Sequence, residues 1–553
     1  MPAITLRVDR LSRFVGVQLS PSQIADLAAA LGMSVEEVGE AEVKVEYNPN
    51  RPDFGSQVSV ARAIKGLLGI ELGAGRYSAR PSKIVVEVER SVEAVRPYIA
   101  CALIHSLNLS EEDVADLIVL QEDLHWILGR DRRKVAIGLH DYSKVQPPFV
   151  YRAVGLSKIR FIPLGSYREM TPQDILFEHP TGRKYAWILQ GKDLAPIILD
   201  SRGNVLSFPP IINSSLTELR PGARELFIDV TGTDEKAVNQ ALNILVTTLI
   251  DLGGVTYKTL IRYKGRRRQV YTPDLSSTKW ILDPSLASSL IGLDLSQREI
   301  VKALRRMRLD AKVSRGKLIV GVPPYRVDIL HPVDLVEEVA IGIGYENLEP
   351  VLPETRGIGA LLPASKTLNV LRQFMLGMGF TEVVNTTLSN TERDFNWMLT
   401  PKEPGVKILN PVSIMYDCLR ELLLPSLLSN LAANSKNPYP QRLFELGDVI
   451  IRNDTLPERA GRERHLAFVT CHSTASFSEL KAVLEEIFRL FEMENSLSAK
   501  DYPFFIPGRG AAIVRGGVEI GFIGEIHPAV LENFGLYMPV AGCEVNLSLL
   551  GVA

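Results

Sequence analysis

The sequence predicts a multidomain protein of the α+β class. Its 553 residues are enough for about three to five domains of roughly 100 to 200 residues each. Two similar segments combine helix and strand patterns, and the last third alternates helices with strands, which favours antiparallel sheets flanked by helices. These observations predict several separate α+β units.

Composition excludes several classes of protein. Hydrophobic residues make up 46% and charged residues 23%, with 62 basic and 64 acidic side chains, which excludes a disordered chain, collagen and a uniformly basic nucleic-acid binder. There is no C-x-x-C pair and no uninterrupted apolar span, and the N-terminus is charged where a signal peptide is apolar. We therefore expect a cytoplasmic protein without a disulfide framework, a cysteine zinc site or a membrane span.

Signatures of common catalytic chemistry are missing. Ala364 stands where a P-loop needs its second glycine, and no complete G-x-G-x-x-G, H-E-x-x-H or G-x-S-x-G motif occurs. An enzymatic function would need a less common set of residues.

An internal repeat marks the first domain and a second copy of it. Residues 16–70 resemble residues 292–345, and the turn that they share is repeated at an offset of 275. Each copy begins with a serine N-cap, Ser20 or Ser296, and continues with apolar residues at helical spacing, a β-rich run, a turn and a second helix. The shared turn favours duplication over chance similarity. Its residues are Pro49, Arg51 and Asp53 in the first copy and Pro324, Arg326 and Asp328 in the second.

The second copy carries four acidic residues, Asp328, Asp334, Glu337 and Glu338, whereas the first keeps only the aspartate of the turn. Acids at a helix N-terminus complement the helix dipole, which accounts for one or two of them. Because like charges at helical spacing repel, four together favour a hard divalent cation, with Mg²⁺ preferred. We therefore predict a Mg²⁺ site at these four residues.

In the middle of the chain, residues 226–230 predict a short apolar strand, followed by a helix capped by Thr233 or Asp234. Asp229 and Thr231 are expected at this junction, where backbone N–H groups and the helix dipole can hold an anion or a developing oxyanion. Asp229 can also orient a water molecule. The alternative interpretation is that these polar residues only cap the helix.

Three other features have a structural and a functional interpretation. The basic clusters at 129–134 and 265–269 can contact phosphates, but a solvated surface is favoured for both, and the second also marks a predicted linker. His140 is expected to be structural rather than part of a site.

Dispersed motifs give the chain a family resemblance. The strings EYNPNRPDFGSQVSVARAIKGLLGI (46–70) and VPPYRVDILHPVDLVEEVAIGIGYENL (322–348) resemble the paired modules of the phenylalanyl-tRNA synthetase beta-subunit family, archaeal or eukaryotic type. Further matches extend over almost the whole chain, among them RRKVAIGLHDYSKV, SFPPIINSSLTEL, LFIDVTGTD and RLFELGDVI.

The resemblance implies partners and a division of labour. A separate alpha subunit would complete an (αβ)₂ heterotetramer, activate phenylalanine with ATP and charge tRNA(Phe). The counterparts of the four acidic residues of the second copy are assigned in the family to a Mg²⁺ shared with the alpha subunit. The chain itself would hydrolyse tyrosine misattached to tRNA(Phe).

The resemblance also implies an organisation in four parts. We expect a first module at 1–85, an editing domain at 86–268, the second module at 269–350, and a class II synthetase-like domain at 356–553. The last part lacks the glycine-rich signature ending in arginine that holds ATP, so we expect a catalytically inert domain for subunit packing, with Glu445 and His527 structural.

For the editing site, the resemblance implies Asp229, Thr231 and Ser207. An apolar pocket cannot strongly reject an isostere that adds a hydroxyl, so a second, hydrolytic site is useful. We expect water attack rather than a covalent intermediate, because no Ser-His-Asp or Cys-His set is recognisable. The alternatives are an RNA-binding scaffold with an inactive editing-like domain and, less favoured, a DNA-binding protein.

Overall fold

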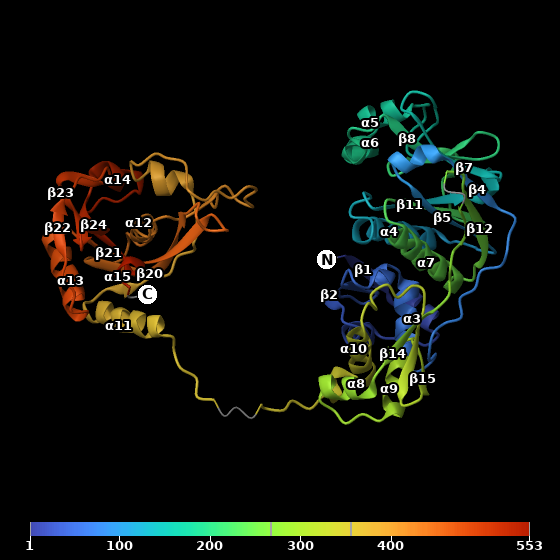
Figure 1. Ribbon diagram of the computed structural model, residues 1–553, viewed down its shortest axis with the longest axis horizontal. Coiled ribbons are helices and arrows are strands. Elements are labelled where there is room, and N and C mark those ends of the chain that lie inside the picture. Colours follow the sequence, from blue (N-terminus) through green and yellow to red (C-terminus); the bar gives the residue numbers. More distant parts are fainter. Residues whose placement is uncertain (1, 266–267, 354–356, 552–553) are drawn as a thin grey trace. The chain divides into compact units, whose positions relative to one another are not determined.

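The computed structural model describes residues 2–265, 268–353 and 357–551 (Figure 1). The chain divides into two compact units, residues 1–352 and 353–553. Each unit mixes helices with β-sheets, which agrees with the predicted α+β class. Within the described part of the chain, no helix is long and apolar enough to cross a membrane.

Two modules in the first unit share one order of elements and one sheet topology. Both sheets are antiparallel with the last strand in the centre, in the orders β1-β3-β2 and β14-β16-β15. The first module comprises β1 (Ala3–Arg7), α1 (Val8–Val15), α2 (Pro21–Ala30), β2 (Ser34–Val38), β3 (Glu42–Glu46) and α3 (Gln57–Leu67). The second comprises β14 (Thr278–Leu282), α8 (Pro284–Ile291), α9 (Gln297–Arg306), β15 (Asp310–Ser314), β16 (Lys317–Val322) and α10 (Pro332–Ile343).

The repeat therefore begins earlier than the sequence comparison places it, at β1 and β14. These two strands, AITLR and TKWIL, share little sequence, so they leave no signal at the shared offset. The predicted serine caps are present, because Ser20 and Ser296 each form a capping box with the residue three positions on.

The part of the chain between the two modules in sequence forms a domain built on a ten-stranded sheet. Its strand order is β10-β9-β8-β7-β4-β12-β5-β11-β6, with β13 paired to β12. Most neighbours are antiparallel, but β4 pairs in parallel with β12 and β7. Its elements are β4 (Val85–Val88), β5 (Tyr98–His105), α4 (Glu111–Ile127), β6 (Val135–Asp141), β7 (Phe149–Gly155), α5 (Pro172–Glu178), α6 (Pro180–Tyr185), β8 (Leu194–Leu199), β9 (Val205–Phe208), β10 (Ile212–Asn213), β11 (Leu226–Gly232), α7 (Glu235–Asp251), β12 (Val255–Tyr263) and β13 (Arg268–Thr272).

The expected boundary at residue 268 falls inside this domain. Strand β13 pairs with β12 from Thr272 to Arg268, so the sheet continues to Thr272 and the second module starts with β14. Of the basic cluster at 265–269, residues 266 and 267 lie outside the described residues.

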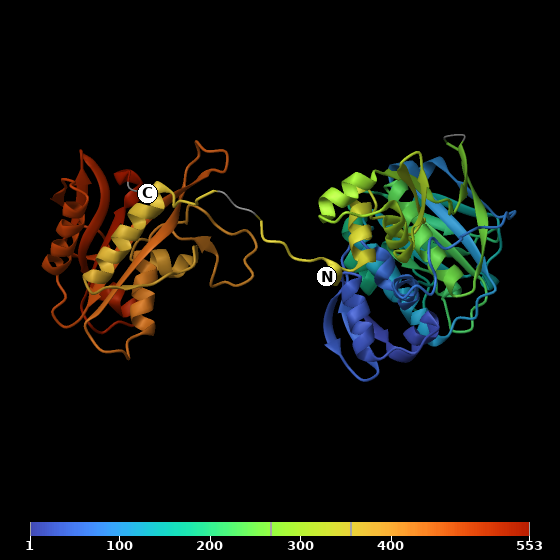
Figure 2. The same ribbon diagram turned by 90° about the horizontal axis from the view of Figure 1, so that it is seen from below.

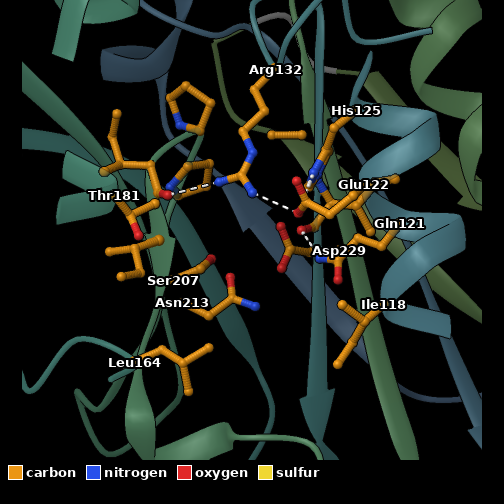
Figure 3. A pocket seen from close by; sticks show the side chains of 16 residues that line it. Ile118, Gln121, Glu122, His125, Arg132, Leu164, Thr181, Ser207, Asn213 and Asp229 are labelled. Carbon is orange, nitrogen blue, oxygen red and sulfur yellow. Dashed lines mark hydrogen bonds and ion pairs between the residues drawn. The ribbon is translucent and has the colours of Figure 1, made fainter. Parts of the chain in front are cut away.

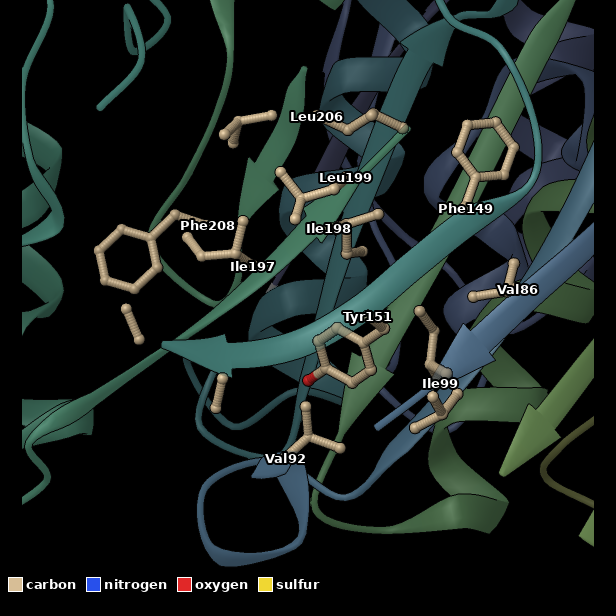
Figure 4. Packing of buried hydrophobic residues seen from close by; sticks show 14 of the residues in the cluster. Val86, Val92, Ile99, Phe149, Tyr151, Ile197, Ile198, Leu199, Leu206 and Phe208 are labelled. Carbon is tan, nitrogen blue, oxygen red and sulfur yellow. The ribbon is translucent and has the colours of Figure 1, made fainter. Parts of the chain in front are cut away.

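The two faces of this sheet have separate cores. Ile228 and Val230 of β11 pack with α4 and α7. Phe227 packs on the other face, in the cluster around Tyr151 and Phe149 that Figure 4 shows. Because successive residues of a strand point to opposite faces, Asp229 and Thr231 share the face of Phe227, away from α7.

The second unit has a seven-stranded sheet of order β17-β20-β21-β25-β24-β23-β22. Helices α11 and α13 contribute to the core on one face and α12 and α14 to the core on the other, and Figure 2 shows helices on both sides. The elements are α11 (Pro363–Gly377), β17 (Thr381–Glu382), β18 (Leu388–Ser389), β19 (Cys418–Leu419), α12 (Leu424–Ala433), β20 (Gln441–Arg452), β21 (Ala460–Cys471), α13 (Phe477–Leu490), β22 (Ser496–Ala499), β23 (Phe505–Arg515), β24 (Val518–Ile526), α14 (Pro528–Asn533), β25 (Val540–Asn546) and α15 (Leu547–Leu550).

Only a short strand joins the sheet after α11, because Thr381 and Glu382 pair with β20 and Val383 adds one backbone hydrogen bond to Phe444. Asn385 instead donates its backbone N–H and its side-chain amide to the buried carboxylate of Glu445. Glu445 also accepts a hydrogen bond from Arg420, and His527 caps α14. Both side chains thus make structural contacts, as expected.

Candidate active site

A cavity of about 250 Å³ opens in the ten-stranded domain (Figure 3). Strand β11 contributes Asp229 and strand β9 contributes Ser207. Helix α4 supplies one wall, and α6 and β10 contribute Thr181 and Asn213. Two of the three predicted editing residues therefore face one cavity.

Asp229 is almost completely buried and is held by a histidine. Its Oδ2 lies 2.6 Å from Nε2 of His140, whose Nδ1 lies 2.8 Å from Oγ1 of Thr217. A Cβ at Gly138 would lie 2.1 Å from Asp229 Oδ2 and 2.5 Å from His140 Nε2, so the pair requires glycine at this position. His140, which was expected to be structural, contacts the candidate residue Asp229 and is therefore a positioning residue for it.

Ser207 contributes a buried hydroxyl without a partner. The residue is 2% exposed, and its Oγ forms no hydrogen bond within the described residues. Leaving such a group unpaired costs about 1–3 kcal/mol. Because Ser207 lines the cavity, this unpaired hydroxyl is the candidate partner for a ligand there.

Thr231 lies behind the cavity wall rather than on it. Its Oγ1 accepts a hydrogen bond of 3.0 Å from Nε of Arg96, whose Nη2 also donates to the carbonyl of Thr231. Arg96 is buried, and burial lowers its pKa to about 10. Thr231 thus anchors a buried guanidinium group and does not line the cavity.

The helix that follows β11 does not serve this cavity. Asp234 caps α7 by accepting the N–H of Ala237, as one of the two predicted caps. Because α7 packs on the opposite face of β11 from Asp229, the anion site expected at its N-terminus together with Asp229 is not formed.

Arg132, predicted to lie on a solvated surface, instead points into the cavity (Figure 3). Arg130, Asp131 and Arg132 all have left-handed backbones, with φ of 48°, 55° and 65°. This turn directs the Arg132 guanidinium over the ring of Tyr185, and its Nη2 donates to Oε1 of Glu122 at 2.6 Å. Left-handed residues other than glycine are costly and concentrate at functional sites.

Helix α4 contributes three polar side chains and one isoleucine to the cavity, none of which was predicted from the sequence. Ile118, Gln121, Glu122 and His125 line the cavity, and their spacing of three, four and seven residues from Ile118 places them on one helix face. That spacing is a signal that could have identified them.

Two of these side chains have shifted pKa values. Burial lowers the pKa of His125, whose Nε2 accepts the backbone N–H of Ile137 at 2.8 Å. For Glu122, burial acts to raise the pKa, but hydrogen bonding from His125 and the charge of Arg132 outweigh it and lower the pKa to about 2. Glu122 is therefore an ionised acceptor at neutral pH.

The four acids predicted to hold Mg²⁺ are not free to act together. Arg326 forms ion pairs of 2.6 Å with both Asp328 and Glu338, and all three side chains are buried. Asp334 accepts two backbone N–H groups at the start of α10, whereas the pKa of Glu337 is raised by burial and by its acidic neighbours. No cluster of three or more potential ligands suited to a metal occurs in the described ranges. As arranged, these residues do not fit Mg²⁺.

Comparisons with known proteins agree with this architecture. The tRNA synthetase B5 domain model matches residues 4–61 and again 281–345, which are the two modules. The phenylalanyl tRNA synthetase beta chain CLM domain model matches residues 348–547. The phenylalanine–tRNA ligase beta subunit of Archaeoglobus fulgidus is 41% identical over 99% of this chain and 98% of its own length. The chain belongs to the phenylalanine–tRNA ligase beta-subunit family.

Two further proteins with the same description are also similar to this chain. The beta subunit of Methanocaldococcus jannaschii is 39% identical over 99% of this chain and the whole of its own. A solved N-terminal fragment of the beta subunit from Pyrococcus horikoshii is 36% identical, with a TM-score of 0.59, and covers 62% of this chain and 99% of the fragment. Family membership places the chain among the aminoacyl-tRNA synthetases.

Proposed function

We propose that this chain is the beta subunit of a phenylalanine–tRNA ligase and that the cavity in its ten-stranded domain hydrolyses tRNA(Phe) mischarged with tyrosine. The unpartnered buried hydroxyl of Ser207 carries this proposal. Water would attack the ester carbonyl, the bond from that carbonyl carbon to the ribose oxygen would break, and tyrosine and tRNA with a free 3′-terminal hydroxyl would leave.

Ser207 and Asp229 give the cavity a physical basis for selecting tyrosine. A phenolic hydroxyl could hydrogen-bond to the Ser207 Oγ and to the Asp229 carboxylate, of which only Oδ2 is used by His140. A phenylalanyl side chain would leave these buried groups unpaired. A site built to bind a hydroxyl rejects the analogue lacking it far more strongly than an apolar pocket rejects an added hydroxyl.

Glu122 and Arg132 supply the groups that hydrolysis needs. The ionised Glu122 carboxylate can accept a hydrogen bond from the attacking water, and Arg132 can stabilise negative charge on the ester carbonyl oxygen. A Ser207 nucleophile activated by His140 is disfavoured, because both ring nitrogens of His140 are engaged by Asp229 and Thr217.

The second unit supports the packing role expected for a catalytically inert domain. Several large apolar side chains between residues 358 and 414 are 80% exposed or more, and such surfaces mark interaction sites. They are Ile358, Val384, Leu409, Val412 and Ile414. We infer that these exposed segments pack against an alpha subunit, which would charge tRNA(Phe) with ATP in a cytoplasmic (αβ)₂ assembly.

Hydrolysis of Tyr-tRNA(Phe) by the assembled enzyme tests the proposal. The wild-type complex should release tyrosine much faster than phenylalanine, and Arg132→Gln should abolish most of this release. An intact complex that charges tRNA but leaves Tyr-tRNA(Phe) untouched would instead favour the RNA-binding scaffold with an inactive domain.

A further inference from the structure

A second cavity, of about 190 Å³, lies where the two modules of the first unit meet helix α7. Four cationic and two carboxylate side chains line it, which leaves a formal excess of two positive charges. The cations are Arg62, Lys65, Arg76 and Arg308, and the carboxylates are Glu71 and Asp251.

Arg308 occupies a position where the sister module has glycine. It follows α9 as Gly32 follows α2, and both have left-handed backbones, with φ of 61° and 83°. The backbone hydrogen bonds also correspond, because Gly32 donates to Ala29 and Arg308 donates to Arg305. Gly32 shows that this turn needs no side chain, and a left-handed backbone at a residue other than glycine costs roughly 1–2 kcal/mol. This cost indicates that the Arg308 side chain has a role of its own.

That side chain is buried with one donor unused. Arg308 is 7% exposed, and its Nη2 donates to Oε2 of Glu71 at 2.9 Å. Its Nε has no hydrogen-bond partner within the described residues. A buried, charged donor without a partner is costly.

Arg62 of α3 repeats this arrangement on the same cavity. It is 5% exposed, and its Nη1 donates to Tyr77 at 3.0 Å and to Asp251 at 2.9 Å. Its guanidinium carbon lies 3.6 Å from the ring centroid of Tyr325. The Nη2 of Arg62 has no partner among the described residues. Two fixed guanidinium groups therefore each keep an unused donor.

We propose that this cavity binds an oxyanion of the phosphate class. Guanidinium groups match phosphate oxygens in geometry and charge, and the exposed Arg76, which forms no ion pair within the described residues, adds charge at the wall. The volume corresponds to about six water molecules, enough for one phosphate group with its hydration. Because the walls come from both modules and from α7, the bound anion ties three segments of the first unit together and stabilises the native state.

Titration of the full chain with inorganic phosphate tests this site. Calorimetry and thermal unfolding are run in potassium phosphate and in potassium chloride of equal ionic strength. The informative variant is Arg308→Gly, which removes the donor and installs the residue that the sister module uses, so the turn is preserved. Arg76→Gln is a second, exposed variant. Arg298→Gln, an exposed change on α9, is the charge-matched control, and Arg132→Gln removes the other cavity's cation.

We expect saturable binding of one phosphate per chain and a higher Tm in phosphate. Arg308→Gly should weaken binding about tenfold or more and Arg76→Gln should weaken it less, while the Arg298 and Arg132 variants keep wild-type affinity. Equal binding by wild type and Arg308→Gly would overturn the site. So would the absence of phosphate-specific binding, since water alone would then satisfy the donors. Competition by unacylated tRNA would identify a backbone phosphate as the source, and its failure to compete would identify a free phosphate compound.

Discussion

His140 and Asp229 form a buried pair on neighbouring strands, with Nε2 and Oδ2 2.6 Å apart. They come from β6 and β11, and Gly138 leaves the space that the pair occupies. Because His140 binds Oδ2 of Asp229, the other carboxylate oxygen, Oδ1, can bind a ligand in the cavity. The pair is therefore the contact on which the geometry of the proposed site depends.

Gly138→Ala should damage the site and the domain together. The new methyl group must displace either Asp229 or His140, and overpacking of this kind costs about 1–3 kcal/mol of unfolding free energy. We expect at least a tenfold fall in kcat/KM for release of tyrosine from Tyr-tRNA(Phe). Gly377→Ala is the control, because nothing lies within 4 Å of a Cβ there. Full hydrolysis by the Gly138 variant would contradict the positioning role of the pair.

Ser207→Ala and Thr231→Val should differ in their effects on stability. Alanine at 207 removes an unpaired buried hydroxyl, so chemical denaturation should give unchanged or higher stability, while selection of tyrosine over phenylalanine is lost. Valine at 231 leaves the Nε of Arg96 unpaired and should cost about 1–3 kcal/mol. If Ser207→Ala is the more destabilising change, its hydroxyl has a partner in the protein and is not reserved for substrate.

Arg132→Gln should reduce the chemical step rather than binding. Losing a group that stabilises a developing oxyanion costs on the order of 10²–10³ in kcat. Arg133→Gln is a matched control, because this neighbour is exposed and its hydrogen bonds within the described residues use only backbone groups, to Arg96 and Arg130. Single-turnover hydrolysis separates the two steps, and an effect on KM alone would assign Arg132 to substrate binding.

Glu122 and His125 should make the first unit sensitive to acid. The Glu122 pKa is about 2 in the fold against 4.5 ordinarily, so its stabilising contribution is full above pH 4.5 and declines as the pH falls toward 2. The pKa of His125 is lowered from 6.5 by burial, so the unfolded chain binds its proton first and stability begins to fall below about pH 6.5. Chemical denaturation of His125→Gln and Glu122→Gln between pH 3 and 8 measures each group's contribution to the free energy of unfolding. If both variants lose stability with falling pH as steeply as the wild type, these groups are not the cause.

Some of the fold and the site could be predicted because the interactions are local in sequence. In each turn an arginine binds the aspartate two residues on, Arg51 with Asp53 and Arg326 with Asp328, so the repeat leaves a recognisable motif. Arg132 could not be predicted, because its direction depends on three left-handed residues and on Tyr185, which is distant in the sequence. The missing partner of Ser207 is likewise a property of packing.

The acidic residues of the second module give the last prediction, on magnesium. The sequence favoured a Mg²⁺ site because four carboxylates gather near one helix start. That inference left out the charge of Arg326, which pairs with both Asp328 and Glu338. With Asp328 and Glu338 paired to Arg326, titration of the free chain with Mg²⁺ should show no saturable heat and no rise in Tm. Arg326→Met should cost about 3–5 kcal/mol by leaving the two acids unpaired, and Mg²⁺ should restore part of that loss. Saturable Mg²⁺ binding by wild type that Asp334→Asn and Glu337→Gln abolish would show that the carboxylates rearrange around the ion, and the site inferred from sequence would then stand.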